Sequence, residues 1–204
     1  LDRDETYADL SPDLAPGPRD FLTVMRGCDK FCTFCVVPFT RGRERSLPVD
    51  AILDQVRAAV RDGKREVVLL GQTVNAWRHD GLDFGDLLRR VASVPGLERI
   101  RFTSPHPSDV GESMIEAMAV EEKVMPWLHL PLQSASDAVL SAMQRGYGLD
   151  EYRRLLDRVR ARVPGLAVST DVIVGFPGET EADFETTERF LREARYDFAY
   201  LFKY

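Results

Sequence analysis

The chain alternates short apolar segments with helical patterns, and this alternation limits the possible folds more than any other feature. Six segments are strand candidates, at residues 21–25, 66–70, 99–103, 127–132, 167–176 and 197–204. Helical periodicity follows the first five, as in Ile52, Val56 and Ala59 after the first segment. Strands that alternate with helices form parallel sheets with right-handed crossovers. The sequence therefore predicts an α/β fold, a partial (β/α)6 barrel with parallel strands.

Five loops follow these strands, and they carry the unusual motifs of the chain. The cysteines follow the first strand; the later loops are GQTVNAW (71–77), SPHP (104–107), PLQS (131–134) and VGFPGET (174–180). In a parallel barrel the loops at the C-terminal strand ends form one rim, where active sites lie. We therefore expect a single site built from all five loops.

All three cysteines, Cys28, Cys32 and Cys35, lie in the first loop with the spacing C-x3-C-x2-C. Thiols at this spacing can hold one side of an iron–sulfur cluster. A four-iron cluster with three cysteines keeps one iron open for a small molecule, as catalytic zinc sites do, which predicts catalysis. Structural zinc is an alternative that lacks a fourth ligand at a suitable spacing. Three unrelated buried thiols are the other alternative.

Length and composition narrow the class of protein. A chain of 204 residues can form one sizeable core, so one domain is expected. It has no apolar run of membrane-spanning length, and its first ten residues are acidic and polar, unlike a signal sequence. An odd cysteine count within one motif argues against disulfides and for a reducing compartment. We therefore expect a cytoplasmic protein with no membrane partner.

The charge of the chain bears on nucleic-acid binding. Its net charge is −6, which counts against RNA binding by the body of this chain. Arg41, Arg43 and Arg45 nevertheless form a local basic stretch beside the cysteine loop. These arginines are candidate contacts for RNA phosphates, and a solvated loop face is the alternative.

The cysteine spacing, with the aromatic Phe34 before the last cysteine, resembles the signature of the radical S-adenosylmethionine (SAM) enzymes. The longer run GCDKFCTFCVVPFTRGRERS (27–46) is similar to the methylthiotransferases, most closely to the MiaB family that modifies tRNA. Segments 71–77, 128–134 and 171–180 match in the same order, so the resemblance spans nearly the whole chain. It implies a [4Fe-4S] cluster on the three cysteines and SAM on the open iron, where an electron from the cluster releases a 5′-deoxyadenosyl radical.

The resemblance also implies which residues contact SAM. In chain order they are Phe34, Gly71, Gln72, Thr73, Gln133, Ser134, Arg145, Asp171, Ile173 and Gly175.

Several of these assignments have a competing interpretation or depart from the family pattern. Phe34 would border adenine or simply be a buried loop aromatic. The segment Gly71-Gln72-Thr73 departs from the commoner Gly-Gly-Glu form of the family, so no carboxylate is available there, and backbone carbonyls and Gln72 would have to meet the SAM amino group. Gly71 could also merely end a strand. Arg145 could grip the methionine carboxylate, although a surface arginine is the simpler interpretation. A lone strand histidine is usually a satisfied core residue, so His129 is left out of the site.

In methylthiotransferases a second iron–sulfur cluster, held by a preceding domain, donates sulfur, and a small RNA-binding domain follows the core. We therefore expect residues 1–19 to be a linker from a missing N-terminal domain and residues 20–204 to be the radical SAM core. The C-terminal RNA-binding domain would be absent, and the second cluster would belong only to the full-length enzyme.

The resemblance implies a tRNA methylthiotransferase that acts on N6-isopentenyladenosine next to the anticodon. Its partners would be the tRNA anticodon stem-loop and an electron donor such as flavodoxin or ferredoxin. One alternative is a methylthiotransferase for threonylcarbamoyladenosine in tRNA or for a ribosomal-protein aspartate. An alternative of another class is a non-catalytic, metal-stapled RNA-binding scaffold.

Overall fold

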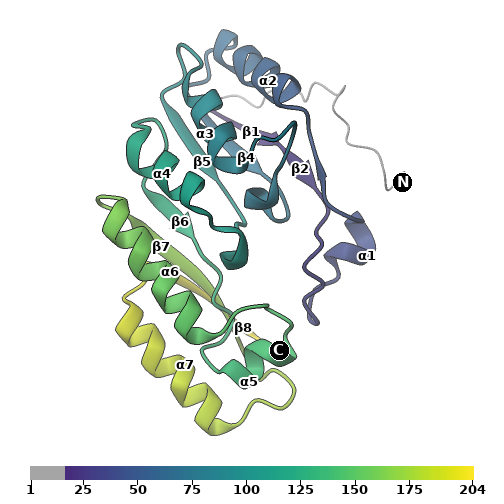
Figure 1. Ribbon diagram of the computed structural model, residues 1–204, viewed down its shortest axis with the longest axis vertical. Helices are drawn as coiled ribbons and strands as arrows, with labels where there is room; N and C mark the ends of the chain where they lie inside the picture. The colour runs from purple at the N-terminus through teal and green to yellow at the C-terminus, as the bar shows by residue number, and fades with distance from the viewer. Residues whose placement is uncertain (1–16) are drawn as a thin grey trace.

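The computed structural model describes residues 17–204, and Figure 1 shows parallel strands with helices packed against them. One parallel sheet has the order β1–β4–β5, formed by Arg19–Thr23, Glu66–Leu70 and Arg99–Phe102. A second has the order β6–β7–β8, formed by Trp127–His129, Ala167–Val174 and Phe198–Lys203. The short strands β2 (Met25–Arg26) and β3 (Arg45–Ser46) pair antiparallel beside them.

The two parallel sheets are joined by backbone contacts. Ile100 of β5 donates to the carbonyl of Lys123 at 2.7 Å and accepts from the N–H of Met125 at 3.0 Å. A parallel bridge between Ile100 and Val124 lies at the same place. The six parallel strands therefore follow one another in chain order, and no pairing joins β1 to β8 within residues 17–204. This arrangement confirms the predicted α/β fold and its parallel strands.

Seven α-helices and two short 3-10 helices occur in the described part of the chain. They are α1 (Val37–Arg41), α2 (Val49–Arg61), η1 (Val74–Ala76), α3 (Phe84–Ala92), η2 (Pro107–Asp109), α4 (Glu112–Val120), α5 (Asp137–Ala142), α6 (Leu149–Arg162) and α7 (Glu181–Ala194). Helix α3 packs against α2 and α4, and α4 packs against α6. This helical layer covers one face of the strands, where apolar side chains such as Leu69 and Phe102 are buried.

Most helices and strands lie where the sequence predicted them. The segment 66–70 is β4, and the cap expected at Thr180 opens α7, because its side chain and that of Asp183 bond each other's backbone N–H groups. The first segment, expected at 21–25, instead divides into β1 and β2. Val24 lies between them, and it donates to Leu70 and accepts from Leu47, so the chain passes there from the parallel sheet to the β2–β3 pair.

Other elements differ from the prediction as well. Strand β6 ends at His129 instead of residue 132, because Pro131 has no N–H for a ladder and only an isolated bridge at Gln133 continues the pairing with β7. Helix α1 and the β2–β3 pair were not predicted, since they are too short to show a period. The expected linker falls mainly on residues 1–16, which lie outside the described residues. No described helix is long and apolar enough to cross a bilayer.

Candidate functional site

A cavity of about 150 Å³ lies at the C-terminal ends of the parallel strands. The cysteine loop and the loops after β4, β5 and β6 line it, together with residues inside β6 and β7. The lining residues are Cys28, Lys30, Cys32, Phe34, Cys35, Gln72, Thr73, Ser104, Pro105, His106, His129, Pro131, Gln133, Arg145 and Asp171. The single site expected from the strand order is therefore present, with one exception. No residue of the loop after β7 lines the cavity, and β7 contributes Asp171 from inside the strand instead.

The three cysteines are unpaired, and Cys28 and Cys32 are buried while Cys35 is half-buried. The Sγ of Cys28 lies 3.0 Å from Thr73 Oγ1, and the backbone N–H of Lys30 donates to the same sulfur at 3.5 Å. Burial raises the pKa of the Cys28 thiol, while the contact with Thr73 opposes that effect. A metal that binds this sulfur would have to displace its proton.

Gly27 fixes the start of the cysteine loop. Its backbone has a φ of +78°, and a Cβ at this position would lie 1.9 Å from the carbonyl oxygen of Arg43. Its N–H donates to Gln72 Oε1 at 2.6 Å, and the next N–H, of Cys28, donates to the Gly42 carbonyl at 3.2 Å. Only glycine combines this conformation with so close a backbone approach.

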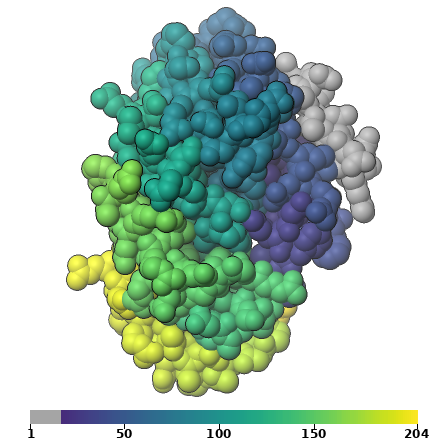
Figure 2. Space-filling view, viewed as in Figure 1, coloured from purple at the N-terminus to yellow at the C-terminus, as the bar shows by residue number. Residues whose placement is uncertain are grey.

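The middle of the loop is held by α5. The N–H of Thr33 donates to the Met143 carbonyl at 3.2 Å, and its hydroxyl donates to the Ala142 carbonyl at 3.0 Å. Figure 2 shows the N-terminal part of the described chain (purple) lying against its teal and green central parts. The cysteines are thus placed by segments far away in the sequence.

The predicted basic stretch lies outside the cavity lining, and part of it supports the loop. Arg43 Nε is 2.7 Å from Asp29 Oδ1, and its guanidinium lies over the Phe31 ring at 5.5 Å. Arg45 donates to the Arg41 carbonyl at 3.2 Å. The side chains of Arg41 and Arg43 are exposed beside the loop.

The donor geometry favours a cluster over a single ion. Within residues 17–204 no three His, Cys, Asp or Glu side chains converge so as to hold one metal ion. A single zinc needs all its ligands at one point, whereas each thiolate of a [4Fe-4S] cluster binds a different iron. Three thiols around one cavity therefore fit the cluster, and structural zinc is disfavoured.

Arg145 is buried, so the surface interpretation of this arginine is wrong. Only 6% of the residue is exposed, and all three guanidinium nitrogens have protein acceptors. Nη1 donates to Cys32 Sγ at 3.4 Å, Nε to the Tyr147 hydroxyl at 3.0 Å and Nη2 to the Pro131 carbonyl at 3.3 Å. Burial alone would lower the pKa of Arg145, but Tyr147 and Cys32 raise it overall. The guanidinium therefore stays charged.

His129 and Asp171 form a polar pair inside the cavity. His129 Nε2 lies 3.1 Å from Asp171 Oδ2, and its Nδ1 lies 2.9 Å from Ser169 Oγ. His129 is a satisfied histidine, as expected, but it also lines the cavity, which its position in the sequence did not predict. The signal that could have found it is that His129 and Asp171 are the only ionisable residues of β6 and β7.

Two other lining residues present polar atoms without partners. His106 Nδ1 accepts from the Ser108 N–H at 3.3 Å, which leaves the proton on Nε2, and Nε2 has no partner among the described residues. Burial, with Arg145 and Lys30 nearby, lowers the pKa of His106 to about 2. Gln133 has a buried, unpartnered Oε1 and a φ of +72°, a strained value for a residue other than glycine. Such atoms at a cavity wall suit a polar ligand.

Four residues that the resemblance placed around SAM are not part of the lining. Ser134 is fully buried, with its hydroxyl 3.3 Å from Thr187 Oγ1. Gly71 packs closely on Met25, and Gly175 donates its N–H to Glu179. Ile173 packs with Phe34 on a small apolar cluster that includes Phe176. Phe34 thus both lines the cavity and packs as a loop aromatic.

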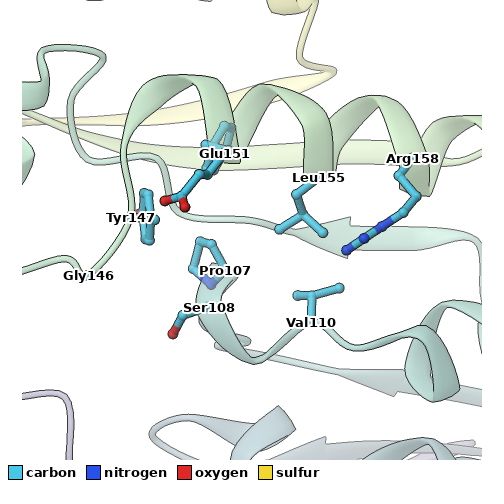
Figure 3. A pocket seen from close by; sticks show the side chains of 9 residues that line it. Pro107, Ser108, Val110, Gly146, Tyr147, Glu151, Leu155 and Arg158 are labelled. Atoms are coloured by element: carbon cyan, nitrogen blue, oxygen red, sulfur yellow. The ribbon is translucent and has the colours of Figure 1, made fainter.

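A second cavity of about 280 Å³ lies between η2 and α6 (Figure 3). Pro107, Val110 and Leu155 give it apolar walls, and Glu151 and Arg158 reach it from α6. Tyr147 belongs to this second cavity, while its hydroxyl contacts Arg145 of the first. Tyr147 therefore separates the two.

Comparisons with known proteins agree with this geometry. The family model described as the radical SAM superfamily matches residues 22–191. A relative from Cereibacter sphaeroides, named tRNA-2-methylthio-N(6)-dimethylallyladenosine synthase, is 52% identical over 188 residues, 92% of this chain and 43% of the relative. A protein of the same name from Erythrobacter litoralis is 48% identical over 98% of this chain and 46% of its own length. The chain thus spans less than half the length of these relatives.

Solved structures share the fold at low sequence identity. The radical S-adenosylmethionine methyltransferase TsrM from Kitasatospora setae matches with a TM-score of 0.75 at 18% identity, over 91% of this chain and 36% of that chain. Methylornithine synthase (PylB) matches with a TM-score of 0.61 at 15% identity, over 91% and 52%. At this identity the likeness shows the fold alone.

Proposed function

This chain belongs to the radical SAM superfamily, and on that premise we propose that it is the catalytic core of a tRNA methylthiotransferase. The observation that carries the proposal is that Cys28, Cys32 and Cys35 all line one cavity at the C-terminal strand ends. The names of the relatives that are about half identical to this chain support the methylthiotransferase assignment.

The three cysteines would hold a [4Fe-4S] cluster, which together with SAM supplies hydrogen-abstraction chemistry when bound. The protein contributes the shape of the loop and the exclusion of water. Gly27 and Thr33 fix the loop at its two sides, and the burial of Cys28 and Cys32 keeps solvent from the sulfurs. Thr73 orients the Cys28 sulfur from the loop after β4.

The polar side chains of the cavity would bind SAM. Gln133 offers an unpartnered carbonyl oxygen, and Asp171, held by His129, offers a carboxylate on the same wall. Phe34 offers an apolar edge for adenine. Gln72 Oε1 already accepts from Gly27, and its amide NH2 can only donate, so nearby backbone carbonyls would accept from the SAM amino group. Four residues lie outside the cavity lining and would support this wall from behind through their backbone and packing: Gly71, Ser134, Ile173 and Gly175.

The substrate we propose is N6-isopentenyladenosine in the anticodon stem-loop of tRNA. Arg41, Arg43 and Arg45 would meet its phosphates, because two of them are exposed beside the cysteine loop. The second iron–sulfur cluster, which would donate sulfur, would be held by the rest of a full-length enzyme. A flavodoxin or ferredoxin would supply electrons, and a tRNA substrate would place the enzyme in the cytoplasm.

Cleavage of SAM by the isolated chain tests this proposal. After anaerobic reconstitution with iron and sulfide, and with dithionite as reductant, the chain should form 5′-deoxyadenosine from SAM and leave isopentenyladenosine in tRNA unmodified. Cys32→Ala should abolish 5′-deoxyadenosine formation, while Val120→Ala, at an exposed helix end, should not. Failure of the wild-type chain to cleave SAM would contradict the proposed core activity, and a methylthio product made by this chain alone would contradict the need for a second cluster.

A further inference from the structure

The buried guanidinium of Arg145 has no carboxylate partner among the residues that the structure describes. No ion pair within residues 17–204 involves it. A buried charge loses its hydration, so such groups are normally paired with an opposite charge. Its three acceptors are a tyrosine hydroxyl, a backbone carbonyl and the sulfur of Cys32. The counter-charge must therefore come from one of these groups or from a bound ligand.

Of these acceptors, only the cysteine sulfur suits the role of anion. The Tyr147 hydroxyl donates to the carbonyls of Pro131 at 3.0 Å and Leu132 at 3.2 Å, which requires that it keep its proton. Carbonyl oxygens carry no net charge. Cys32, by contrast, becomes a thiolate whenever it binds iron.

We propose that Arg145 is a positioning residue that tunes the iron–sulfur cluster through its hydrogen bond to Cys32, an inference that rests on the cluster assigned above. Reduction adds one negative charge to a cluster. A fixed positive charge and a donated N–H at a cluster sulfur stabilise the reduced form and so raise its reduction potential. Arg145 thereby makes the cluster easier to reduce.

The surroundings hold Arg145 in this orientation. Tyr147 accepts from Nε at 3.0 Å, and its ring lies 5.3 Å from the guanidinium carbon. The same tyrosine forms part of the second cavity (Figure 3). Tyr147→Phe would keep the ring but remove the hydroxyl, so it should loosen the guanidinium without removing its charge.

The reduction potential of the SAM-free cluster tests the proposal. Reconstituted wild-type chain, Arg145→Met, Arg145→Lys and Tyr147→Phe are titrated with a mediated reductant, and the reduced cluster is followed by electron paramagnetic resonance. We expect a shift to more negative potential that is largest for Arg145→Met and smaller, in the same direction, for the other two. Arg153→Met is the matched control, because it removes a cation of α6 that pairs with Glu193 of α7, and it should not shift the potential.

SAM affinity, measured by equilibrium dialysis of the same proteins, separates the two roles open to Arg145. An unshifted potential together with a large loss of SAM affinity would show that the guanidinium grips the methionine carboxylate, and the inference would be overturned. If Arg145→Met cannot hold a cluster, unshifted potentials in both Arg145→Lys and Tyr147→Phe would overturn it equally. Failure of the wild-type chain to assemble a cluster would instead refute the proposed function.

Discussion

The side-chain oxygen of Gln72 accepts a hydrogen bond from the backbone N–H of Gly27 at 2.6 Å. This bond joins the loop after β4 to the start of the cysteine loop. Gln72→Ala should lower the free energy of unfolding by about 1 kcal/mol, the net value of one hydrogen bond, and should speed iron loss from the reconstituted chain. Gln72→Glu keeps an acceptor oxygen and should retain iron. Equal iron loss in both variants would show that this acceptor does not hold the loop.

A side chain at Gly27 should disrupt the same loop. A Cβ there would meet the Arg43 carbonyl at 1.9 Å, and φ is +78°. Gly63→Ala is the matched control, because its φ is +85° but nothing lies within 4 Å of the added Cβ. The control should cost roughly 1–2 kcal/mol from backbone strain alone, and Gly27→Ala clearly more, in urea unfolding. Equal costs would mean that the loop backbone shifts freely.

The sequence was sufficient to predict the parallel strands, because the regular spacing of apolar residues identifies helices and strands without knowledge of distant contacts. The same topology placed five loops on one rim, which the cavity confirms apart from the loop after β7. Val24 shows what local patterns miss. It lies within an apolar run, yet it leaves the sheet because its carbonyl accepts from Leu47.

The cavity walls were harder to predict than the cysteine motif. Arg145 lies in the loop after α5 and looks like a surface residue in the sequence, but it is buried and contacts Cys32, 113 residues away. His129 and Asp171 are 42 residues apart and meet only through the pairing of β6 with β7. Such pairs depend on tertiary register, which a single sequence does not reveal.

The stability of the protein should decline in mild acid because of His106. Its pKa is lowered to about 2, so between that value and its ordinary value of 6.5 the unfolded chain binds a proton that the folded chain refuses. The contribution of the neutral His106 ring to the free energy of unfolding is therefore fully present above pH 6.5. This contribution is lost as the pH falls below 6.5, by at most about 1.4 kcal/mol per pH unit. His106→Gln should flatten this slope in urea unfolding from pH 7 to 5. An unchanged slope would assign the acid sensitivity to other groups.

The basic stretch should contribute salt-dependent binding of tRNA in the complete enzyme. Replacing Arg41, Arg43 and Arg45 together by Gln should weaken tRNA binding. The replacement should also reduce the slope of log affinity against log salt concentration by about one for each phosphate that the variant no longer neutralises. Arg153, Arg158 and Arg162 on α6 are the control triple, with the same charge change on the outer helical layer. Equal slopes in the two triple variants would reassign the stretch to a solvated loop that supports Asp29.

Iron and sulfide content tests the central assignment most directly. After anaerobic reconstitution and desalting, the wild-type chain should contain about four irons and about four labile sulfides, with brown visible absorbance. A variant with Cys28, Cys32 and Cys35 all replaced by Ser should contain neither iron nor sulfide. One zinc per wild-type chain with no labile sulfide would contradict a cluster on these three cysteines.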